Sequence, residues 1–505
     1  SKVVIVDKEK CVSCYRCISV CPVKFCNTAI SDVIEVDENL CIGCAECIDN
    51  CTHGARIGVD DFDTFLKALK NNEKIIAIIA PSIVANFPDN YKQFNGWLKS
   101  IGIQGIFDVS FGAELTIKSY LNHLKHNKPK LIISQPCPVI VSFIEIYIPE
   151  LLEYLAPCDS PMMHTIKMVK TFYPDFKNHK VLVVSPCISK KREFDEVGYG
   201  NYNVIMKKFS DYFKENNINI NQFPGVDFDN APAERAVLFS SPGGLLRTAE
   251  REVPGISDNS RKIEGPEILY KYLTGLLKDI KRGINPVLID CLNCPMGCNN
   301  GTGTSRDKTF DEVEYYVEKR NTEAQKVYKN SNNSRKKSSL RKIHRTLNKY
   351  WKEDLYSRKY VNHYENFQKR IKIPDKQQLD DIYKQMNKIK KEDFKNCSNC
   401  SYNACEQMAI AIFNNINKID NCHQYINTVA ISEKNEKEQL YRELDNKVEV
   451  IYVMLNSILD SLQNLVQQIN DEGSVINEVS SSIKILLQSL YEIYESGVGV
   501  SRKRI

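Results

Sequence analysis

Long apolar segments are scarce in this sequence. The most apolar long stretch, residues 131–148, is interrupted by Ser134, Gln135, two prolines and Glu145, whereas a membrane-spanning helix needs about 20 largely apolar residues. We therefore expect a buried core segment there and no membrane span. The opening SKVVIV is too short an apolar run for the core of a secretory signal peptide.

A strong charge imbalance is also missing. The net charge of +5 over 505 residues is too small to indicate a nucleic-acid partner by itself. With 42% apolar and 26% charged residues, the chain has the composition of a soluble globular protein. Its length predicts roughly three or four domains.

Cysteine, in contrast, is abundant, with 19 residues. In a secreted protein so many cysteines would suggest disulfides. Here most of them fall in short-spaced clusters, the chain is long, and no export signal is found. We therefore favour thiolates bound to iron in a reducing cytoplasm.

The first 60 residues carry one cysteine motif twice. The spacing C-x2-C-x2-C-x3-C is followed by Pro22 in the first copy and by Thr52 in the second. This motif binds paired [4Fe–4S] clusters, and the fourth cysteine of each copy ligates the other cluster. Cys26 is left over, and we interpret it as a loop thiol. The two expected ligand sets are Cys11, Cys14, Cys17 and Cys51, and Cys41, Cys44, Cys47 and Cys21.

Residues 62–305 have an α/β pattern, in which apolar strands alternate with helical stretches. Several cysteines and prolines come just after a strand, where open sheets usually bind ligands. The expected strands, including two in the N-terminal part, are Val3–Val6, Ile34–Val36, Lys74–Ala80, Leu131–Ser134, Lys180–Ser185, Ala236–Phe239 and Pro286–Ile289, and the expected helices include Asp61–Leu69 and Gly112–Leu124.

Three cysteine segments follow expected strands: residues 134–138 (SQPCP), 185–193 (SPCISKKRE) and 291–301 (CLNCPMGCNNG). Gly297 and Gly301 permit close backbone approach, so the segments are able to supply four thiolates at one sheet edge. Free cysteines are often simply buried, and structural cysteines are the alternative interpretation.

In order and spacing, these segments resemble the three signature segments of the iron–iron (FeFe) hydrogenase catalytic domain. With the ferredoxin-like entry domain, the resemblance covers about residues 1–305. It implies an H-cluster, whose two-iron subsite carries CO, cyanide and an azadithiolate, with Lys190 donating a hydrogen bond to a cyanide. Cys298 would bridge the two parts of the cluster. The implied ligands of its [4Fe–4S] part are Cys137, Cys187, Cys294 and Cys298, and two further matching stretches are Ala80, Pro81 and Ser82, beside the two-iron subsite, and Phe111–Thr116.

The chain departs from this family along the proton path. The family places a proton-donating cysteine directly before the first ligand cysteine, where this chain has Pro136. Proline has no titratable group and no N–H. General acid–base transfer typically contributes roughly 10²–10⁴-fold in rate, so we expect a site that binds hydrogen but turns over slowly. The other departures are Lys118, Ser119, Tyr120 and Ala156 in the proton relay, and Ser185 and Leu292 in place of methionines.

A third cysteine group lies near the C-terminal end. Its spacing resembles the small Fe–S domain of electron-transfer subunits and sensory hydrogenases, although four thiolates also suit zinc. We favour [4Fe–4S] because of the resemblance, and we interpret the adjacent His423 as structural. Cys405 opens a stretch expected to be helical. The four expected ligands are Cys397, Cys400, Cys405 and Cys422.

Two other segments have a distinctive pattern. The basic run of residues 335–342 favours a solvated helical linker over a surface for an acidic partner or nucleic acid. From Leu440 to Ile469, and again from Ile476 to Ile493, apolar residues recur every three or four positions. This predicts a long helix that forms a coiled-coil dimer, or one packed on its own domain. The helix is similar to part of a methyl-accepting signalling hairpin, and no kinase or phosphatase motif is found.

These observations predict an α/β multidomain protein that senses hydrogen or redox state in the cytoplasm through slow H₂ oxidation and proton reduction. The alternatives are a competent hydrogenase with a different proton path, for which Cys158 and Cys291 are candidate thiols, and a non-catalytic relative in Fe–S assembly. Expected partners are H₂ and protons, either a ferredoxin-like electron carrier or none, hydrogenase maturation proteins and a second copy of the chain. The expected parts are a two-cluster ferredoxin-like domain (1–60), the FeFe-hydrogenase-like H-cluster domain (61–310), a basic helical linker and core extension (311–395), a four-cysteine Fe–S domain (396–425) and a coiled-coil signalling helix (430–505).

Overall fold

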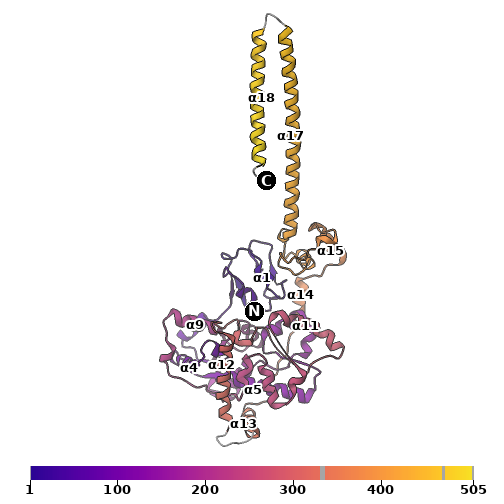
Figure 1. Ribbon diagram of the computed structural model, residues 1–505. Helices are drawn as coiled ribbons and strands as arrows, with labels where there is room; N and C mark the ends of the chain where they lie inside the picture. The colour runs from indigo at the N-terminus through magenta and orange to yellow at the C-terminus, as the bar shows by residue number, and fades with distance from the viewer. Residues whose placement is uncertain (1, 330–335, 469–472, 503–505) are drawn as a thin grey trace. The chain divides into compact units, whose positions relative to one another are not determined.

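The computed structural model describes residues 2–329, 336–468 and 473–502 (Figure 1). The chain folds into two compact units, Ser1–Ile419 and Asp420–Ile505. Within the described ranges, no helix combines the length and the apolar character needed to cross a membrane.

The N-terminal part is built as two similar halves. Strand β1 (Val4–Val6) pairs antiparallel with β4 (Arg56–Gly58), and β2 (Asn27–Thr28) pairs antiparallel with β3 (Glu35–Val36). Each half contains one short helix, and each helix carries the third cysteine of its motif. These helices are α1 (Arg16–Ser19) and α2 (Glu46–Asp49).

The central part contains two parallel sheets. One has the strand order β6-β5-β8-β9 and the other has the order β10-β11-β7. All five residues of β5 are completely buried, as expected for a parallel strand covered on both faces. The strands are β5 (Ile75–Ile79), β6 (Ile106–Asp108), β7 (Ile132–Ile133), β8 (Lys180–Ser185), β9 (Tyr202–Ile205), β10 (Ser260–Glu264) and β11 (Leu288–Leu292).

Helices cover both sheets and connect their strands. The helices of the first unit after α2 are α3 (Phe62–Lys70), α4 (Tyr91–Ser100), α5 (Val109–Asn127), α6 (Pro138–Tyr147), α7 (Pro161–Phe172), α8 (Lys190–Val197), α9 (Met206–Glu215), α10 (Gly244–Glu252), α11 (Pro266–Lys281), α12 (Phe310–Tyr328), α13 (Lys336–Lys349), α14 (Tyr364–Arg370), α15 (Lys376–Gln385) and α16 (Cys405–Phe413).

Two strand predictions need correction. The apolar segment Ala236–Ser240 is a 3₁₀ helix, not a strand, because the buried Glu114 carboxylate accepts three consecutive backbone N–H groups, from residues 234–236, and so holds the chain in a turn. The strand expected at Pro286–Ile289 is shifted to β11, whose first residue follows the proline by two positions. Proline has no N–H to give to a strand ladder.

The basic segment is part of the core as well as its surface. Helix α13 holds the described part of the basic run, whereas Arg335 lies outside the described residues. Ile343 and Leu347 of this helix are buried in the main apolar cluster. The segment is therefore a core extension with a basic outer face, not a purely solvated linker.

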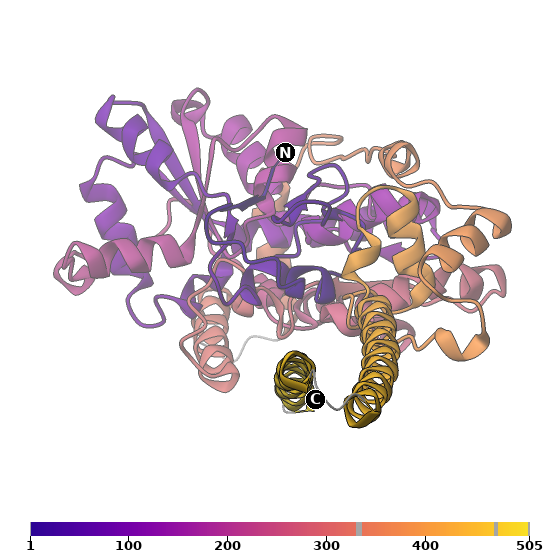
Figure 2. The same cartoon turned by 90° about the horizontal axis from the view of Figure 1, so that it is seen from above.

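The second unit is a helical hairpin in place of the single long helix that was predicted. Helices α17 (His423–Gln468) and α18 (Gly473–Arg502) run antiparallel, side by side, as Figures 1 and 2 show. The rings of Tyr452 and Tyr491 lie 5.9 Å apart across the hairpin. Ile469 lies outside the described residues, and the side chains of Ile476, Leu490 and Ile493 are not described.

Candidate metal centres

A cavity lies at the carboxyl ends of strands from both sheets. Its space, including the open mouth, measures about 790 Å³. Ser185, which the sequence analysis also singled out, is not among the described residues that line this cavity. Nine candidate ligand and contact residues do line it. These are Ala80, Pro81, Ser82, Pro136, Cys137, Cys187, Lys190, Cys294 and Cys298.

The cavity forms because parallel strands place their following loops at one edge. Strand β5 leads into Ala80 and the 3₁₀ helix Pro81–Ala85, and β8 leads directly to Cys187. Strands β7 and β11, which belong to the other sheet, lead to Cys137 and Cys294. The four thiols therefore come from two sheets that face one cavity, not from one sheet edge as predicted.

The thiols that line the cavity repel one another as anions. Burial, followed by the neighbouring cysteines, raises the pKa of Cys298 to about 12. The same causes raise the pKa of Cys187 and raise that of Cys294 well above its usual value. Thiolates bind metals, and a bound cationic centre would offset this burial and repulsion. The donor set therefore suits a thiolate-ligated metal cluster.

Two glycines make the cysteine loop fit the cavity wall. Gly297 has φ +75°, and a Cβ on it would lie 2.5 Å from the backbone oxygen of Ser240. A Cβ on Gly301 would lie 2.4 Å from the oxygen of Pro186, directly before Cys187. Only glycine lets the Cys298 loop approach both neighbours this closely. The loop is therefore shaped to bring its thiols to the others.

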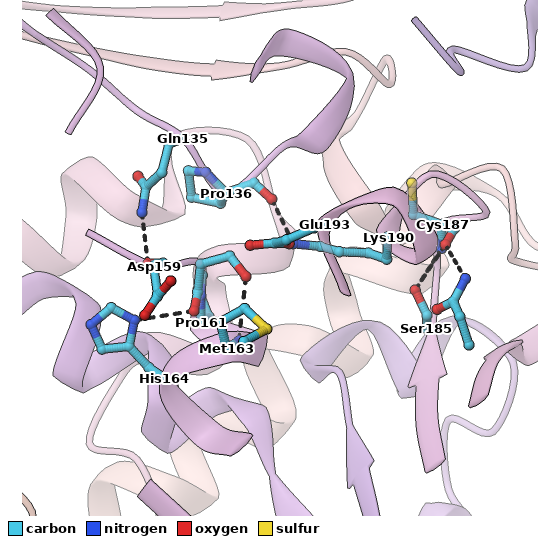
Figure 3. A network of polar contacts seen from close by, with 12 residues as sticks. Gln135, Pro136, Asp159, Pro161, Met163, His164, Ser185, Cys187, Lys190 and Glu193 are labelled. Atoms are coloured by element: carbon cyan, nitrogen blue, oxygen red, sulfur yellow. Dashed lines mark hydrogen bonds and ion pairs between the residues drawn. The ribbon is translucent and has the colours of Figure 1, made fainter. Parts of the chain in front are cut away.

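Lys190 is the buried cation at the cavity. It opens α8, and its ammonium donates to the carbonyl oxygen of Pro136 at 2.9 Å and to Glu193 at 2.6 Å (Figure 3). Glu193 also accepts from Arg358 at 2.9 Å. Burial opposes ionisation of Glu193, but its two cationic partners lower its pKa. The ammonium is thus held in place by an ionised carboxylate.

Two of the positions that replace the expected proton relay, Ser119 and Tyr120, make buried polar contacts. Ser119 and Thr116 of α5 contact the ring nitrogens of His164 at 2.9 and 3.2 Å. Burial lowers the pKa of His164 to about 3, so the ring is neutral at physiological pH. Tyr120 donates to the side-chain oxygen of Gln135. The amide nitrogen of Gln135 in turn donates to the carbonyl oxygens of residues 158 and 159, at 2.9 and 2.7 Å.

The second ferredoxin-type ligand set converges in the fold. Burial raises the pKa of Cys44 well above its usual value, and the next causes are Cys21, Cys47 and Cys41. These are the three other members predicted from the motif. In the first set, burial raises the pKa of Cys17, opposed by a nearby arginine and reinforced by its motif neighbours at positions 14 and 11.

The arginine near Cys17 is Arg56, which no sequence motif singles out. It is 4% exposed, and its guanidinium lies 3.1 Å from the Cys17 sulfur. The same side chain acts electrostatically on Cys47 of the other set. One of its terminal nitrogens is buried without a hydrogen-bond partner. Arg56 therefore places a positive charge between the two ferredoxin-type sets.

The unassigned cysteines have clear surroundings. Cys26 is buried, and its sulfur lies 3.7 Å from that of Cys21. Hydrogen bonds to Cys21 and Cys41 raise the pKa of Cys26 well above its usual value, so it stays a protonated thiol. Cys158 and Cys291 are also buried, and neither is among the described residues that line the cavity.

The C-terminal cysteine loop has the backbone of the other cluster loops. The residue after the second cysteine has a left-handed conformation in all three: Tyr15 (φ 60°), Ala45 (φ 66°) and Ser401 (φ 71°). Such turns direct successive N–H groups toward a common anion. Cys405 begins α16, as predicted. Cys422 belongs to the second unit, so the convergence of all four cysteines stays a prediction.

Two known protein families match parts of this chain. Residues 73–302 match the family described as iron only hydrogenase large subunit, C-terminal domain. Residues 4–25, which contain the first cysteine motif, match the 4Fe-4S binding domain.

Three curated relatives are similar over about half of this chain. Iron hydrogenase 1 of Clostridium pasteurianum is 28% identical over 329 residues, 56% of this chain and 57% of that protein. The NADP-reducing hydrogenase subunit HndD of Solidesulfovibrio fructosivorans is 25% identical over 374 residues, 59% of this chain and 64% of that subunit. Protein NAR1 of Arabidopsis thaliana is 20% identical over 324 residues, 49% of this chain and 68% of that protein. The chain thus spans little more than half the length of the first of these relatives.

A solved [FeFe]-hydrogenase, from work on oxygen inactivation of the H cluster 2Fe subcluster, superimposes with a TM-score of 0.46. It is 19% identical, and the match covers 60% of this chain and all of that one.

Proposed function

The chain belongs to the iron–iron hydrogenase family, and on that premise we propose that it holds an H-cluster and works as a hydrogen or redox sensor with slow turnover. The observation that carries this proposal is Pro136, which lines the cavity beside Cys137 where the proton donor is expected. The ligands of the cluster are present, while the group that would exchange protons with it is absent.

In this proposal the four cavity thiols would hold the [4Fe–4S] part of the H-cluster, and Cys298 would be the ligand nearest the two-iron subsite, which carries CO, cyanide and an azadithiolate. The group supplies, when bound, the metal chemistry that splits or forms H₂. Lys190 would donate to a cyanide ligand, since it lines the cavity. Ala80, Pro81 and Ser82, which also line the cavity, would lie beside the two-iron subsite.

Proton transfer is the slow process. Pro136 offers only a carbonyl oxygen, and this oxygen already accepts from Lys190. The groups behind it do not form a substitute path, because Tyr120 and Gln135 bond to each other and to backbone carbonyls. A missing general acid typically lowers the rate by roughly 10²–10⁴-fold. The site therefore binds hydrogen, but the rate at which it oxidises or forms hydrogen is low.

Electrons reach the cavity through the ferredoxin-type clusters, which a ferredoxin-like carrier reduces or oxidises. Maturation proteins install the two-iron subsite in the cytoplasm. The second unit is the output element, and it dimerises with a second copy. Its apolar residues support this pairing, since Val450–Met454 are exposed in the described structure. A stretch of five exposed apolar residues on a helix favours a further helical partner.

The test is the rate of H₂ oxidation by the matured full chain, compared with an ordinary catalytic hydrogenase at equal H-cluster content. We expect a rate lower by at least 10²-fold. Infrared bands of CO and cyanide should shift under H₂ at the same time, because hydrogen still binds. A rate equal to that of the catalytic enzyme would instead support the competent hydrogenase with a different proton path.

A non-catalytic role is the second candidate, and the similarity to protein NAR1 favours it. That relative is not named a hydrogenase. In this case the cavity cysteines hold an Fe–S cluster without the two-iron subsite. The matured protein would then contain iron and sulfide but give no infrared bands from CO or cyanide.

A further inference from the structure

Lys24 is a buried lysine in the ferredoxin-type domain whose role the motif does not explain. It is 6% exposed and has a left-handed backbone with φ 41°. Its ammonium donates to the carbonyl oxygens of Ile18 at 3.1 Å and Ser19 at 2.8 Å, within its own domain. The third acceptor is the carbonyl of Ser401 at 2.8 Å, 377 residues away. This one side chain therefore ties the N-terminal cluster domain to the C-terminal cysteine loop.

Other contacts hold the same two segments together. The ring of Tyr402, which is completely buried, lies 6.0 Å from the ring of Phe25. The backbone N–H of Ala29 donates to the carbonyl of Ile416 at 2.7 Å. One of these contacts precedes α16 in the sequence and the other follows it. The cysteine loop therefore packs against the ferredoxin-type domain.

The charge of Lys24 acts on cysteines of both cluster loops. Burial lowers its pKa, while Cys21 on one side and Cys400 on the other raise it. Clusters ligated by thiolates carry negative charge, and nearby charges and hydrogen bonds set their reduction potentials. A buried ammonium between two such groups stabilises the reduced, more negative state of each.

We propose that the Cys397–Cys405 loop and the ferredoxin-type domain form an electron-exchange junction, in which Lys24 is the shared positive charge that keeps both clusters reducible. One electron leaves the reduced cluster of the Cys21 set, which becomes oxidised, and reduces the cluster of the C-terminal loop. No bond forms or breaks. This inference rests on the proposed sensor function, because it gives the redox state of the cavity a route to the segment that precedes the helical hairpin.

The experiment uses the full chain with its [4Fe–4S] clusters reconstituted and without the two-iron subsite, so hydrogen chemistry plays no part in it. Potentiometric titration followed by electron paramagnetic resonance gives the reduction potential of each cluster. A Cys400→Ser variant identifies the C-terminal signal. In the wild type, the two reduced clusters should broaden each other's spectra, and this broadening should vanish in the variant.

Lys24→Met removes the charge, and Lys24→Arg keeps it. We expect the methionine variant to lower the reduced-to-oxidised ratio at a fixed potential by at least tenfold for both clusters, whereas the arginine variant stays within about twofold of the wild type. Tenfold corresponds to about 59 mV for a one-electron couple. Lys8→Met is the matched control, because that lysine is exposed and forms a surface ion pair with Glu35.

Three results would overturn the proposal. Zinc, or no iron, at the C-terminal cysteines would remove one of the two clusters. Absence of mutual broadening would show that the clusters are not neighbours. Equal shifts in the methionine and arginine variants would assign Lys24 a packing role only. Each of these results leaves the slow-sensor proposal at the cavity intact, since none depends on an installed H-cluster.

Discussion

Replacing Pro136 with cysteine should return a proton donor to the cavity and raise turnover. The residue lines the cavity, and its carbonyl bond to Lys190 uses a backbone atom that the substitution retains. A thiol at this position can therefore face the cluster without loss of the ammonium contact. The preceding Gln135 keeps its own backbone partners, so the local loop is expected to hold.

The size of the increase in turnover rate depends on whether neighbouring groups can pass protons to the new thiol. A full general-acid path contributes roughly 10²–10⁴-fold, but Tyr120 and Gln135 are engaged with each other, and the neutral His164 ring has its nitrogens occupied. The thiol must then be reprotonated by water at the cavity mouth. We expect an increase of about tenfold, equivalent to roughly 1.4 kcal/mol of barrier.

The assay is dye-linked H₂ oxidation by the matured variant, normalised to the infrared intensity of its H-cluster. Pro136→Ala and Pro136→Ser are the controls, because they remove the ring without adding a thiol. If Pro136→Cys is no faster than Pro136→Ala at equal cluster content, proton donation at this position does not limit the rate, and the reasoning fails.

Other features of the fold allow predictions of the same kind. Lys190→Met should lower the free energy of unfolding of the cluster-free chain by about 3 kcal/mol in urea titrations, because it leaves the buried Glu193 with Arg358 alone; a loss below about 1 kcal/mol would contradict the buried pairing. Burial raises the pKa of Glu145 from 4.5 to about 7, so its contribution to stability is fully present below pH 4.5 and is lost as the pH rises through 7. Glu145→Gln should therefore be more stable than the wild type at pH 8, by up to about 3 kcal/mol, and a gain equal at pH 4.5 and pH 8 would refute this. Ile451→Glu, at a position 52% exposed in the hairpin, should shift the chain from dimer to monomer in light scattering, and an unchanged mass would argue against a dimer through this face.

The cavity cysteines were predictable because the signal for them is local. Each follows an apolar run that folds as a strand, and parallel strands bring their following loops together whatever the rest of the chain does. The position of Pro136 at the site was predictable for the same reason, because it directly precedes Cys137 in the sequence.

The features that were not predicted from the sequence depend on contacts between residues far apart in the chain. The Ala236 segment has the composition of a strand, but the carboxylate of Glu114, more than a hundred positions earlier, caps it as a turn. Arg56, His164 and Lys24 are ordinary polar residues in the sequence, and only the fold buries them beside cysteines or inside a polar network. The heptad pattern of the second unit is the same for one long helix and for a hairpin, so periodicity alone did not separate them.

We propose that a hydrogenase-type cluster is held in a cavity that has lost its proton donor. Infrared spectroscopy of the matured full chain tests it most directly, with one sample under argon and one under H₂. We expect bands from bound CO and cyanide that shift under H₂, together with turnover at least roughly 10²-fold below that of a catalytic hydrogenase. A matured protein with a full complement of iron and no such bands would contradict it.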